Sequence, residues 1–443
     1  MAVKVGIVSL GCAKNQVDAE KMAYMIKAGG FELCGDAALA EVVIVNTCGF
    51  IESAKQEAIE TVLEFGKLKE EGRIKKIIVT GCLAERYREE IRKEIPEADA
   101  VVGIGSNSDI CGIIKRVSDG ETVESYGDKE SLSLEGGRLV STLPFFAYLK
   151  ITEGCDNRCS YCAIPMIRGR YRSRKIEDIL EEAKWLASHG VREINVIAQD
   201  TTRYGIDLYN KKMLPELLRE LCKIEEFKWI RVLYCYPDEL TDELLDVMAS
   251  EEKIVKYIDL PIQHINSEVL KRMNRRGNRK QVEEAIEKIR TKIKDVTLRT
   301  TLITGFPGET EEQFTELAEF VKATEFDRLG CFPYSAEEGT PAAVLDDQLE
   351  EDIKQSRADH IMEVQMLISE RHNQRMLGKT VEAVVEGFDR YAECYFGRTA
   401  ADAPDIDGKI FFTSENKRMM GEFVKVHIDD VLDYDLVGTV VED

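Results

Sequence analysis

Three cysteines that lie close together in the sequence carry the strongest chemical signal in the chain. They stand in the run Cys155-Asp-Asn-Arg-Cys159-Ser-Tyr-Cys162, which follows a segment typical of a β-strand. Three thiolates at this spacing can ligate three irons of a 4Fe–4S cluster and leave the fourth iron open to a substrate or cofactor. A structural zinc site is the main alternative, but zinc normally takes four nitrogen or sulfur ligands. Since the nearest further candidate ligand in the sequence is His189, the iron–sulfur interpretation is favoured.

A second set of three cysteines shares a structural position instead of a local spacing. Cys12, Cys48 and Cys82 each lie beside a glycine at the end of a predicted buried strand. The carboxyl ends of strands in an open parallel sheet meet at the crevice where ligands bind, and gaps of 36 and 34 residues fit one strand–helix unit each. Three separate core cysteines are the alternative, because free cysteine is often buried. The shared position favours a second cluster held by three thiolates.

The composition restricts the remaining possibilities. The 443 residues include twelve cysteines and five histidines, and 60 basic residues face 82 acidic ones, for a net charge of −22. This acidity argues against general electrostatic binding of nucleic acid, which needs a local basic excess. No apolar run approaches the roughly 18 residues of a membrane span, and the first residues lack the layout of a signal peptide. We therefore expect a cytoplasmic protein with reduced cysteines and no membrane partner.

Six further cysteines share no spacing and are predicted to pack in cores: Cys34, Cys111, Cys222, Cys235, Cys331 and Cys394.

Three regions of the chain must position these residues. Residues 1–118 alternate short Val- and Ile-rich runs with amphipathic stretches, which predicts an α/β domain with an open parallel sheet. Residues 119–140 are polar and indicate a linker or an excursion at the edge of the sheet. The strands expected in the first region are Val3–Leu10, Val42–Thr47 and Ile77–Thr80, and the helices are Val17–Ala28, Ser53–Leu68 and Arg86–Ile95.

Residues 141–372 repeat the alternation over six longer units. This pattern predicts a partial (β/α)6 barrel, similar to an incomplete TIM barrel, with its chemistry at the carboxyl ends of the strands. The expected strands are Phe146–Ile151, Glu193–Ile197, Trp229–Tyr234, Tyr257–Leu260, Thr297–Ile303 and Arg328–Phe332. The expected helices are Ile176–Ser188, Leu214–Lys223, Glu239–Ala249, Gln281–Lys292 and a long one over Asp347–Met376.

Residues 373–443 alternate on a short period without a helical stretch. A small antiparallel β-barrel of the OB-like kind is expected there. Its strands are predicted at Val381–Val385, Tyr391–Arg398, Lys409–Thr413, Glu422–Ile428 and Leu436–Val441.

These features together resemble a known family. The cysteine run, with Tyr161 before its last cysteine, is similar to the radical SAM motif. With the amino-terminal cysteines and a terminal barrel similar to a TRAM domain, the chain resembles radical SAM methylthiotransferases over nearly its whole length. Ala13 stands where the RimO branch of that family usually has proline, a loop position beside a ligand. Four phrases are similar to the RimO branch: Ser9-Leu10-Gly11-Cys12-Ala13-Lys14-Asn15, Asn46-Thr47-Cys48-Gly49-Phe50-Ile51, Ile197-Ala198-Gln199-Asp200-Thr201 and Tyr334-Ser335-Ala336-Glu337-Glu338-Gly339-Thr340-Pro341.

The resemblance implies a transferase with two 4Fe–4S clusters and S-adenosylmethionine as cofactors. The open iron at Cys155, Cys159 and Cys162 would bind S-adenosylmethionine, whose cleavage gives the 5′-deoxyadenosyl radical that takes hydrogen from the substrate. The second cluster would hold or supply sulfur, and a second S-adenosylmethionine would supply the methyl group. A helix cap is the alternative role for Asp200, and an ordinary polar loop position the alternative for His264. The residues implied for the S-adenosylmethionine pocket are Tyr161, Gln199, Asp200, Gln263 and His264.

The substrate implied by the RimO branch is the β-carbon of an aspartate in a small-subunit ribosomal protein. From Met376 to Asp443 the chain has 15 acidic and 7 basic residues, and an acidic barrel complements a basic protein and repels RNA. We therefore expect two partners, a basic ribosomal protein (free or in the subunit) and an external electron donor, without stable general nucleic-acid binding. The alternatives are a tRNA adenosine methylthiotransferase of the MiaB kind and, from another class, a non-catalytic iron–sulfur protein that docks on the ribosome.

Two basic runs interrupt the acidic background, Arg168–Arg174 and Lys271–Lys280. A solvated face is the expected reading of both. Contact with a substrate carboxylate or with ribosomal RNA is the alternative.

Overall fold

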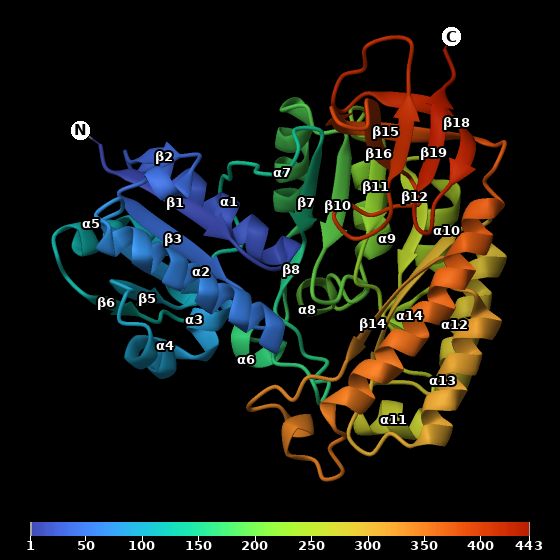
Figure 1. Ribbon diagram of the computed structural model, residues 1–443, viewed down its shortest axis with the longest axis horizontal. Helices are drawn as coiled ribbons and strands as arrows, with labels where there is room; N and C mark the ends of the chain where they lie inside the picture. The colour runs from blue at the N-terminus through green and yellow to red at the C-terminus, as the bar shows by residue number, and fades with distance from the viewer. Residues whose placement is uncertain (1, 443) are drawn as a thin grey trace. The chain divides into compact units, whose positions relative to one another are not determined.

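The computed structural model describes residues 2–442 and divides them into two compact units (Figure 1). The first unit runs up to Ser141 and also contains Thr152–Arg174 and Ser335–Ala343. The second unit contains Thr142–Ile151, Lys175–Tyr334 and the chain from Val344 onward. The first unit therefore contains all six cysteines that the sequence marks as cluster ligands.

The first unit is built on a six-stranded parallel sheet, which confirms the predicted open parallel α/β arrangement. Its strand order is β2-β1-β3-β4-β5-β6. The strands are β1 (Lys4–Ser9), β2 (Glu32–Cys34), β3 (Val42–Thr47), β4 (Lys76–Gly81), β5 (Ala100–Val102) and β6 (Val123–Ser125). The last of these is an edge strand within the stretch that the sequence indicates as a linker. The helices are α1 (Ala13–Ala28), α2 (Glu52–Glu70), α3 (Cys82–Arg86), α4 (Arg88–Glu94), α5 (Ile110–Ser118) and, just after Cys162, α6 (Ile164–Arg168).

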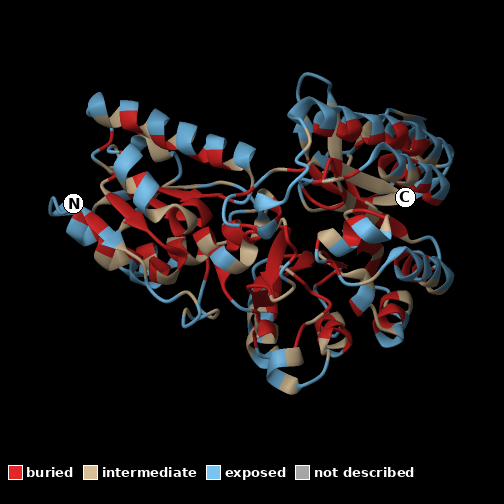
Figure 2. Ribbon diagram, turned by 90° about the horizontal axis from the view of Figure 1, so that it is seen from below, coloured by how far each residue is buried: buried red, intermediate tan, exposed pale blue. Residues whose placement is uncertain are grey.

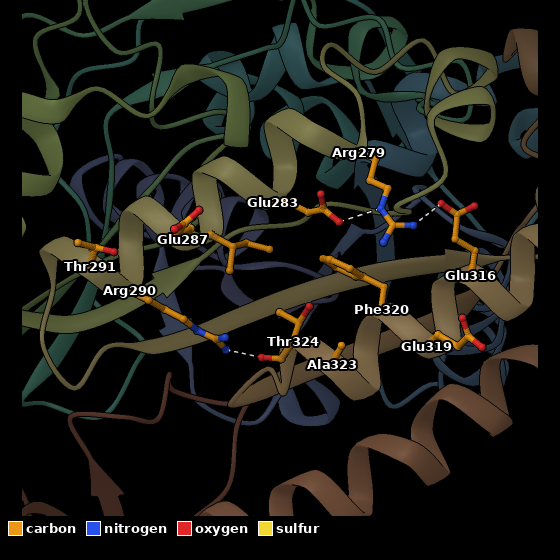
Figure 3. Close-up of a pocket in the computed structure, with 11 residues that line it drawn as sticks. Arg279, Glu283, Glu287, Arg290, Thr291, Glu316, Glu319, Phe320, Ala323 and Thr324 are labelled. Carbon is orange, nitrogen blue, oxygen red and sulfur yellow. Dashed lines mark hydrogen bonds and ion pairs between the residues drawn. The ribbon is translucent and has the colours of Figure 1, made fainter.

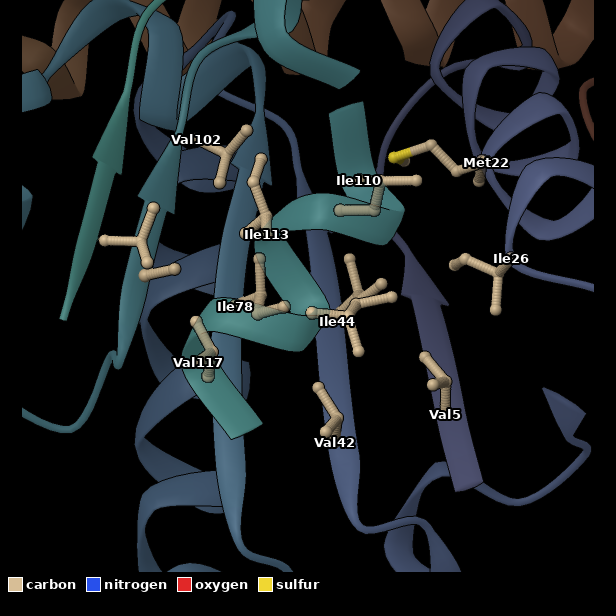
Figure 4. Packing of buried hydrophobic residues seen from close by; sticks show 14 residues of the cluster. Val5, Met22, Ile26, Val42, Ile44, Ile78, Val102, Ile110, Ile113 and Val117 are labelled. Carbon is tan, nitrogen blue, oxygen red and sulfur yellow. The ribbon is translucent and has the colours of Figure 1, made fainter. Parts of the chain in front are cut away.

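Apolar cores cover both faces of this sheet. On one face, Met22 of α1 and Ile113 of α5 pack with Ile44 of β3 (Figure 4). On the other face, Val62 of α2 and Ile91 of α4 pack against the same strands. Every residue of β3 is consequently buried, as expected for a central strand with helices on both sides, and Figure 2 shows the buried residues concentrated in the strands. The sheet is thus rigid up to the strand ends that carry the cysteines.

The second unit begins with an open six-stranded parallel sheet in the order β14-β13-β12-β11-β10-β7, which confirms the predicted partial barrel. Its strands are β7 (Phe146–Lys150), β10 (Glu193–Ile197), β11 (Trp229–Val232), β12 (Ile254–Asp259), β13 (Thr297–Thr304) and β14 (Arg328–Pro333). Its helices are α7 (Ile176–Ser188), α8 (Ile206–Tyr209), α9 (Leu214–Cys222), α10 (Asp242–Ser250), α11 (Ser267–Arg272), α12 (Arg279–Lys292), α13 (Glu311–Thr324) and α14 (Glu351–Gln374).

The C-terminal strands form a closed five-stranded barrel in the order β15-β16-β17-β19-β18, as expected. They are β15 (Thr380–Asp389), β16 (Cys394–Thr399), β17 (Ile410–Thr413), β18 (Phe423–Val431) and β19 (Leu436–Val440). One pair departs from the antiparallel expectation, because β17 runs parallel to β19. An odd number of strands cannot alternate in direction around a closed ring, so at least one parallel pair is required.

The loop after β16 connects this barrel to the parallel sheet of the same unit. Asp402 accepts a hydrogen bond from Arg328, the first residue of β14, at 2.6 Å. Asp407 accepts one from the Tyr257 hydroxyl of β12, also at 2.6 Å. Both carboxylates are 4% exposed. Two of the acidic residues of the tail are therefore buried and bind residues of β12 and β14 instead of facing solvent.

Of the six cysteines predicted to pack in cores, Cys235 and Cys331 are buried. The other four are only partly buried: Cys34, Cys111, Cys222 and Cys394. Among residues 2–442, no helix is both long enough and apolar enough to cross a membrane.

Candidate iron–sulfur sites

The loop that carries Cys155, Cys159 and Cys162 is closed at its base by a short antiparallel pair, β8 (Thr152–Glu153) with β9 (Arg172–Ser173). The Cys155 amide donates to the carbonyl of Gly169 at 3.2 Å, and the Cys162 amide donates to the carbonyl of Cys159 at 3.0 Å. Cys155 and Cys159 are buried, and Cys162 is partly exposed. The three cysteines therefore lie on one loop whose base and last turn are held by backbone hydrogen bonds.

The amino-terminal cysteines lie at the ends of three adjacent strands. Cys12 is the N-cap residue of α1, just after β1. Cys48 follows β3 directly, and Cys82 is the first residue of α3, directly after β4. Because β1, β3 and β4 are consecutive neighbours in the sheet, their carboxyl ends lie along one edge. The structure therefore places the three cysteines at the edge where ligands bind in such sheets.

Two glycines allow the cysteine loops to approach one another. A Cβ on Gly11, whose φ is +84°, would lie 2.6 Å from Cys48 Cβ and 2.8 Å from its sulfur. A Cβ on Gly49 would lie 2.7 Å from the Cα of Leu83 and 3.1 Å from the carbonyl carbon of Cys82. Such distances are too short for any side chain, so the close contact of the three loops depends on glycine at both positions.

The three thiols of this set also interact electrostatically. Burial raises the pKa of Cys82 to about 12 and also raises the pKa of Cys48, and the nearby Cys12 adds to both increases. Cys12 is the exposed member of the set, and its pKa is lowered: the atoms packed around its sulfur would raise the pKa, but the charges of Lys14 and Arg168 together with the backbone amides of Asn15 and Lys14 outweigh that effect. Cys12 is therefore the thiol of this set most readily available as a thiolate, the form that binds metal.

The thiol chemistry fits iron–sulfur clusters. All twelve cysteines are free thiols, so neither set is consumed by a disulfide. In the described part of the chain no three His, Cys, Asp or Glu side chains already stand in a metal-binding arrangement. The fit therefore depends on the donors themselves. Thiolates are the usual ligands of iron–sulfur clusters, and the two sets of three would each leave one iron of a 4Fe–4S cluster without a cysteine.

The first basic run is not a solvated face, and that expectation is wrong. Arg168 and Arg174 are buried, with 2% and 3% of their side chains exposed. Arg172 donates to the carbonyls of Leu132 and Lys129 at 2.9 and 2.8 Å. The two arginines at the end of the run are separated by one residue. Arg172 lies in β9 and Arg174 follows it, and because alternate residues of a strand point to the same side, both side chains point the same way. In this run only Arg170 remains largely exposed, at 72%.

Arg168 is the buried member that reaches a candidate cluster ligand. Its Nη2 lies 3.3 Å from the Cys82 sulfur and 3.2 Å from Asn15 Oδ1. Asn15 in turn donates from its amide to the carbonyls of Leu10 and Asn46, at 2.8 and 3.1 Å. This network connects α6 with the ends of β1, β3 and β4.

The sequence reasoning missed the roles of Arg168 and Asn15. In the sequence, Asn15 stands out only as part of a motif similar to the RimO branch, and Arg168 only as part of a basic run. An arginine in an acidic chain, in the helix that directly follows Cys162, was the available signal for Arg168. For Asn15 the sequence holds no comparable signal, because apart from Leu10 its backbone partners, Asn46 and Thr47, lie 31 and 32 residues away at the end of β3.

Gln199 and Asp200 follow β10, at the carboxyl edge of the second unit's sheet. Gln199 is partly buried, and Asp200 is fully buried and accepts a hydrogen bond from the Thr202 hydroxyl at 2.7 Å. Asp200 does not cap a helix, because α8 begins only at Ile206 with Gly205 as its N-cap. Tyr161 is partly buried in the cysteine loop. Their contact with S-adenosylmethionine stays a prediction.

Gln263 and His264 follow β12. Gln263 has a left-handed backbone, with φ of +69°, and pairs with Leu302 of β13. His264 is fully buried, with its Nε2 3.4 Å from Glu309 Oε2. Although burial alone would raise the pKa of Glu309, His264 and Arg357 lower it. His264 Nδ1 accepts a hydrogen bond from the Asn266 amide at 3.0 Å, and a role of this side chain in the cofactor pocket stays a prediction.

A separate groove of about 690 Å³ runs along α12 and α13 on the outside of the second unit (Figure 3). Arg279 bridges Glu283 of its own helix and Glu316 of α13, at 2.8 and 2.7 Å. The groove is lined by helix residues, whereas the chemistry of a parallel barrel lies at its strand ends. It is not the candidate site.

The family matches agree with this architecture. Residues 4–103 match the uncharacterized protein family UPF0004, residues 149–321 match the radical SAM superfamily, and residues 377–441 match the TRAM domain. Among solved structures, the radical S-adenosylmethionine methyltransferase TsrM from Kitasatospora setae, with cobalamin and a [4Fe-4S] cluster bound, has a TM-score of 0.56 at 15% identity. It covers 78% of this chain and 77% of its own. That likeness is one of fold.

These matches define a radical SAM enzyme with a UPF0004 region and a TRAM domain, a class that uses 4Fe–4S clusters and S-adenosylmethionine. The ribosomal protein uS12 methylthiotransferase RimO of Thermoanaerobacter sp. (strain X514) is 50% identical over 98% of this chain and 99% of its own length. The RimO of Clostridioides difficile (strain 630) is 50% identical over 99% of each chain. The chain belongs to the RimO family of radical SAM methylthiotransferases, as the sequence motifs indicate.

Proposed function

We propose that this protein transfers a methylthio group to the β-carbon of an aspartate in ribosomal protein uS12. The observation that carries the proposal is the 50% identity with uS12 methylthiotransferases over nearly the full length of both chains. The two sets of three free cysteines supply the ligands that two 4Fe–4S clusters need. A C–H bond without an activating group requires radical chemistry, which proteins leave to such cofactors.

The residues divide the work between the two cysteine sets. We assign Cys155, Cys159 and Cys162 to the cluster that binds S-adenosylmethionine, and the amino-terminal cysteines to the auxiliary cluster that handles sulfur. When bound, these clusters supply the electron for cleavage of S-adenosylmethionine and the site for the transferred sulfur. The protein's own part is to hold the two loops, through the backbone hydrogen bonds of β8 and β9 and the packing of α3 against α6.

We further propose that the tail barrel faces its basic substrate through exposed acidic residues. Asp402, Asp407 and Glu386 are buried in ion pairs or hydrogen bonds and cannot serve this purpose. Acidic residues on the β18–β19 hairpin remain exposed, namely Asp429, Asp430 and Asp433. Opposite charge steers a basic partner toward this hairpin and disfavours RNA. A ribosomal substrate places the enzyme in the cytoplasm, where an external donor must supply electrons.

The test compares two substrates under identical conditions. The anaerobically reconstituted enzyme is incubated with S-adenosylmethionine, reductant and either uS12 or unmodified tRNA, and each product is analysed by mass spectrometry. We expect the mass of a methylthio group only on a uS12 aspartate. Modification of tRNA alone would instead establish the MiaB-like activity.

The same reaction separates the enzyme from a non-catalytic iron–sulfur protein. A catalytic chain releases 5′-deoxyadenosine when it is strongly reduced, even without substrate. An intact chain that holds both clusters but leaves S-adenosylmethionine uncleaved would support a docking or sensing role.

A further inference from the structure

One buried guanidinium joins the helix after the radical SAM cysteines to the auxiliary cysteine site. α6 begins two residues after Cys162 and ends at Arg168. Arg168 directs Nη2 at the sulfur of Cys82, at 3.3 Å, inside the packed contact between α6 and α3. Both groups are buried, so no bulk water competes for this hydrogen bond.

Neutralisation of the arginine does not explain this contact. Nη1 forms ion pairs with Asp18, in a short contact, and with Glu153 at 3.5 Å. Two carboxylates therefore already compensate the single positive charge, which an arginine keeps at any accessible pH. The other end of the guanidinium remains for Asn15 and Cys82. A purely structural ion pair would leave a buried thiol without this donor.

The effect of such a donor on an iron–sulfur cluster follows from its chemistry. Reduction adds negative charge to a cluster, and hydrogen bonds to its sulfurs are among the factors that set its reduction potential. A fixed guanidinium on a ligating sulfur stabilises that added charge. Residues around the ligands also orient them, and their loss commonly weakens metal binding.

We propose that Arg168 is a positioning residue that orients Cys82 as a ligand of the auxiliary cluster and makes that cluster easier to reduce. The inference rests on the proposed function, in which Cys12, Cys48 and Cys82 hold a cluster. In this proposal, the contact between α6 and α3 holds Arg168 beside Cys82 and so raises the reduction potential of the auxiliary cluster.

The test isolates the auxiliary cluster in the full-length chain. The C155A/C159A/C162A chain is reconstituted with iron and sulfide, and its potential is measured by redox titration with EPR detection. R168M removes charge and donor, and R168K keeps the charge but loses the planar fork. R170M is the matched control, because Arg170 stands in the same segment and is 72% exposed.

We expect R168M to favour the oxidised cluster about tenfold more than R170M does, which is about 59 mV for one electron. The reduction potential of R168K is expected to lie between those of R168M and R170M. Because its lysine still neutralises Asp18, R168K should fold even if R168M does not. Equal potentials and equal iron contents in R168K, R170M and the parent would overturn the inference, as would equal values in a folded R168M.

Failure of the proposed cluster is distinguishable. If the parent C155A/C159A/C162A chain binds no iron, the auxiliary cluster itself is refuted, and the inference about Arg168 falls with it. If the parent binds about four irons and the substitutions of Arg168 leave the reduction potential unchanged, the inference about Arg168 fails while the auxiliary cluster stands.

Discussion

Arg398 of β16 and Glu193 of β10 form a fully buried ion pair across 205 residues of sequence, with Nη2 2.8 Å from Oε2. The same carboxylate accepts from Arg231 of β11 at 3.4 Å, and Arg398 also binds Glu386 of β15. One network thus fastens the C-terminal barrel to the start of the parallel sheet. The barrel is therefore a fixed part of the second unit and not a tethered appendage.

Removing the carboxylate of Glu193 should destabilise this unit strongly. Glu193→Gln leaves two buried guanidiniums short of a partner, and breaking one side of a buried pair typically costs about 3–5 kcal/mol. The exposed pair between Lys228, just before β11, and Glu382 of β15, at 3.0 Å, also links the parallel sheet with the barrel and provides the control. We expect Glu382→Gln to cost less than about 1 kcal/mol in denaturant unfolding. Equal losses in the two variants would show that the buried network is not what fastens the barrel.

The same pair predicts a specific dependence on pH. Burial would raise the pKa of Glu193, but Arg398 and Arg231 outweigh it and lower the pKa. A carboxylate whose folded pKa is depressed stabilises the fold above its unfolded pKa of about 4.3, and this contribution disappears as the pH falls through the folded value. The difference in unfolding free energy between wild type and Glu193→Gln should therefore be constant at neutral pH and shrink below about pH 4. A difference that grows in acid would contradict the assignment.

The two cysteine sets should fail in different ways. Cys155→Ala should abolish the formation of 5′-deoxyadenosine, because this loop is assigned to the cluster that binds S-adenosylmethionine. Cys12→Ala should still permit that cleavage but should lose transfer of the methylthio group. Chromatography of the nucleoside and mass spectrometry of uS12 measure the two steps separately. Full methylthiolation by Cys12→Ala would refute the second cluster.

The exposed acids of the β18–β19 hairpin should act on substrate binding and not on cofactor chemistry. Reversing the charge at Asp429, Asp430 and Asp433 is expected to raise the KM for uS12 severalfold and to leave the substrate-free cleavage of S-adenosylmethionine unchanged. Equal reversal on α2, at the exposed Glu57, Glu60 and Glu64, controls for net charge. If both triple variants raise KM alike, the hairpin has no special role.

The sequence predicts the parts of the fold that repeat a regular pattern. β10 and α7 occur with the predicted limits, because Ile194, Val196 and Ile197 mark the strand and a helical period of apolar residues marks the helix. β5 and β6 were missed, since three-residue strands at the side of a sheet carry too short a pattern. The parallel pair of β17 and β19 depends on how the whole barrel closes, which no local window contains.

In the candidate site too, local patterns can be predicted from the sequence and contacts between distant segments cannot. Local spacing and strand ends suffice to find the six cysteines as candidates. The burial of Arg168 could not be predicted, because it depends on Asp18 and Asn15, about 150 residues away in the sequence. For His264 the sequence allows both a cofactor contact and an ordinary polar loop position, and the structure buries the side chain beside Glu309.

The two glycines Gly11 and Gly30 offer a final test of the amino-terminal site. Both have φ of +84°, so alanine imposes the same backbone strain, roughly 1–2 kcal/mol, at either position. They differ in what the new methyl group meets. At Gly30 nothing lies within 4 Å, whereas at Gly11 the methyl group would collide with the Cβ and sulfur of Cys48. Gly11→Ala must therefore move a candidate ligand, and Gly30→Ala need not.

Iron and sulfide analysis after anaerobic reconstitution measures the difference. We expect about eight irons per chain in wild type and in Gly30→Ala, and about four in Gly11→Ala, because only the auxiliary cluster is lost. Thermal unfolding of the two apo-proteins checks that both variants fold with similar stability. A Gly11→Ala chain that retains about eight irons would contradict the prediction, because it would show that the auxiliary cluster does not depend on the close approach of Gly11 to Cys48.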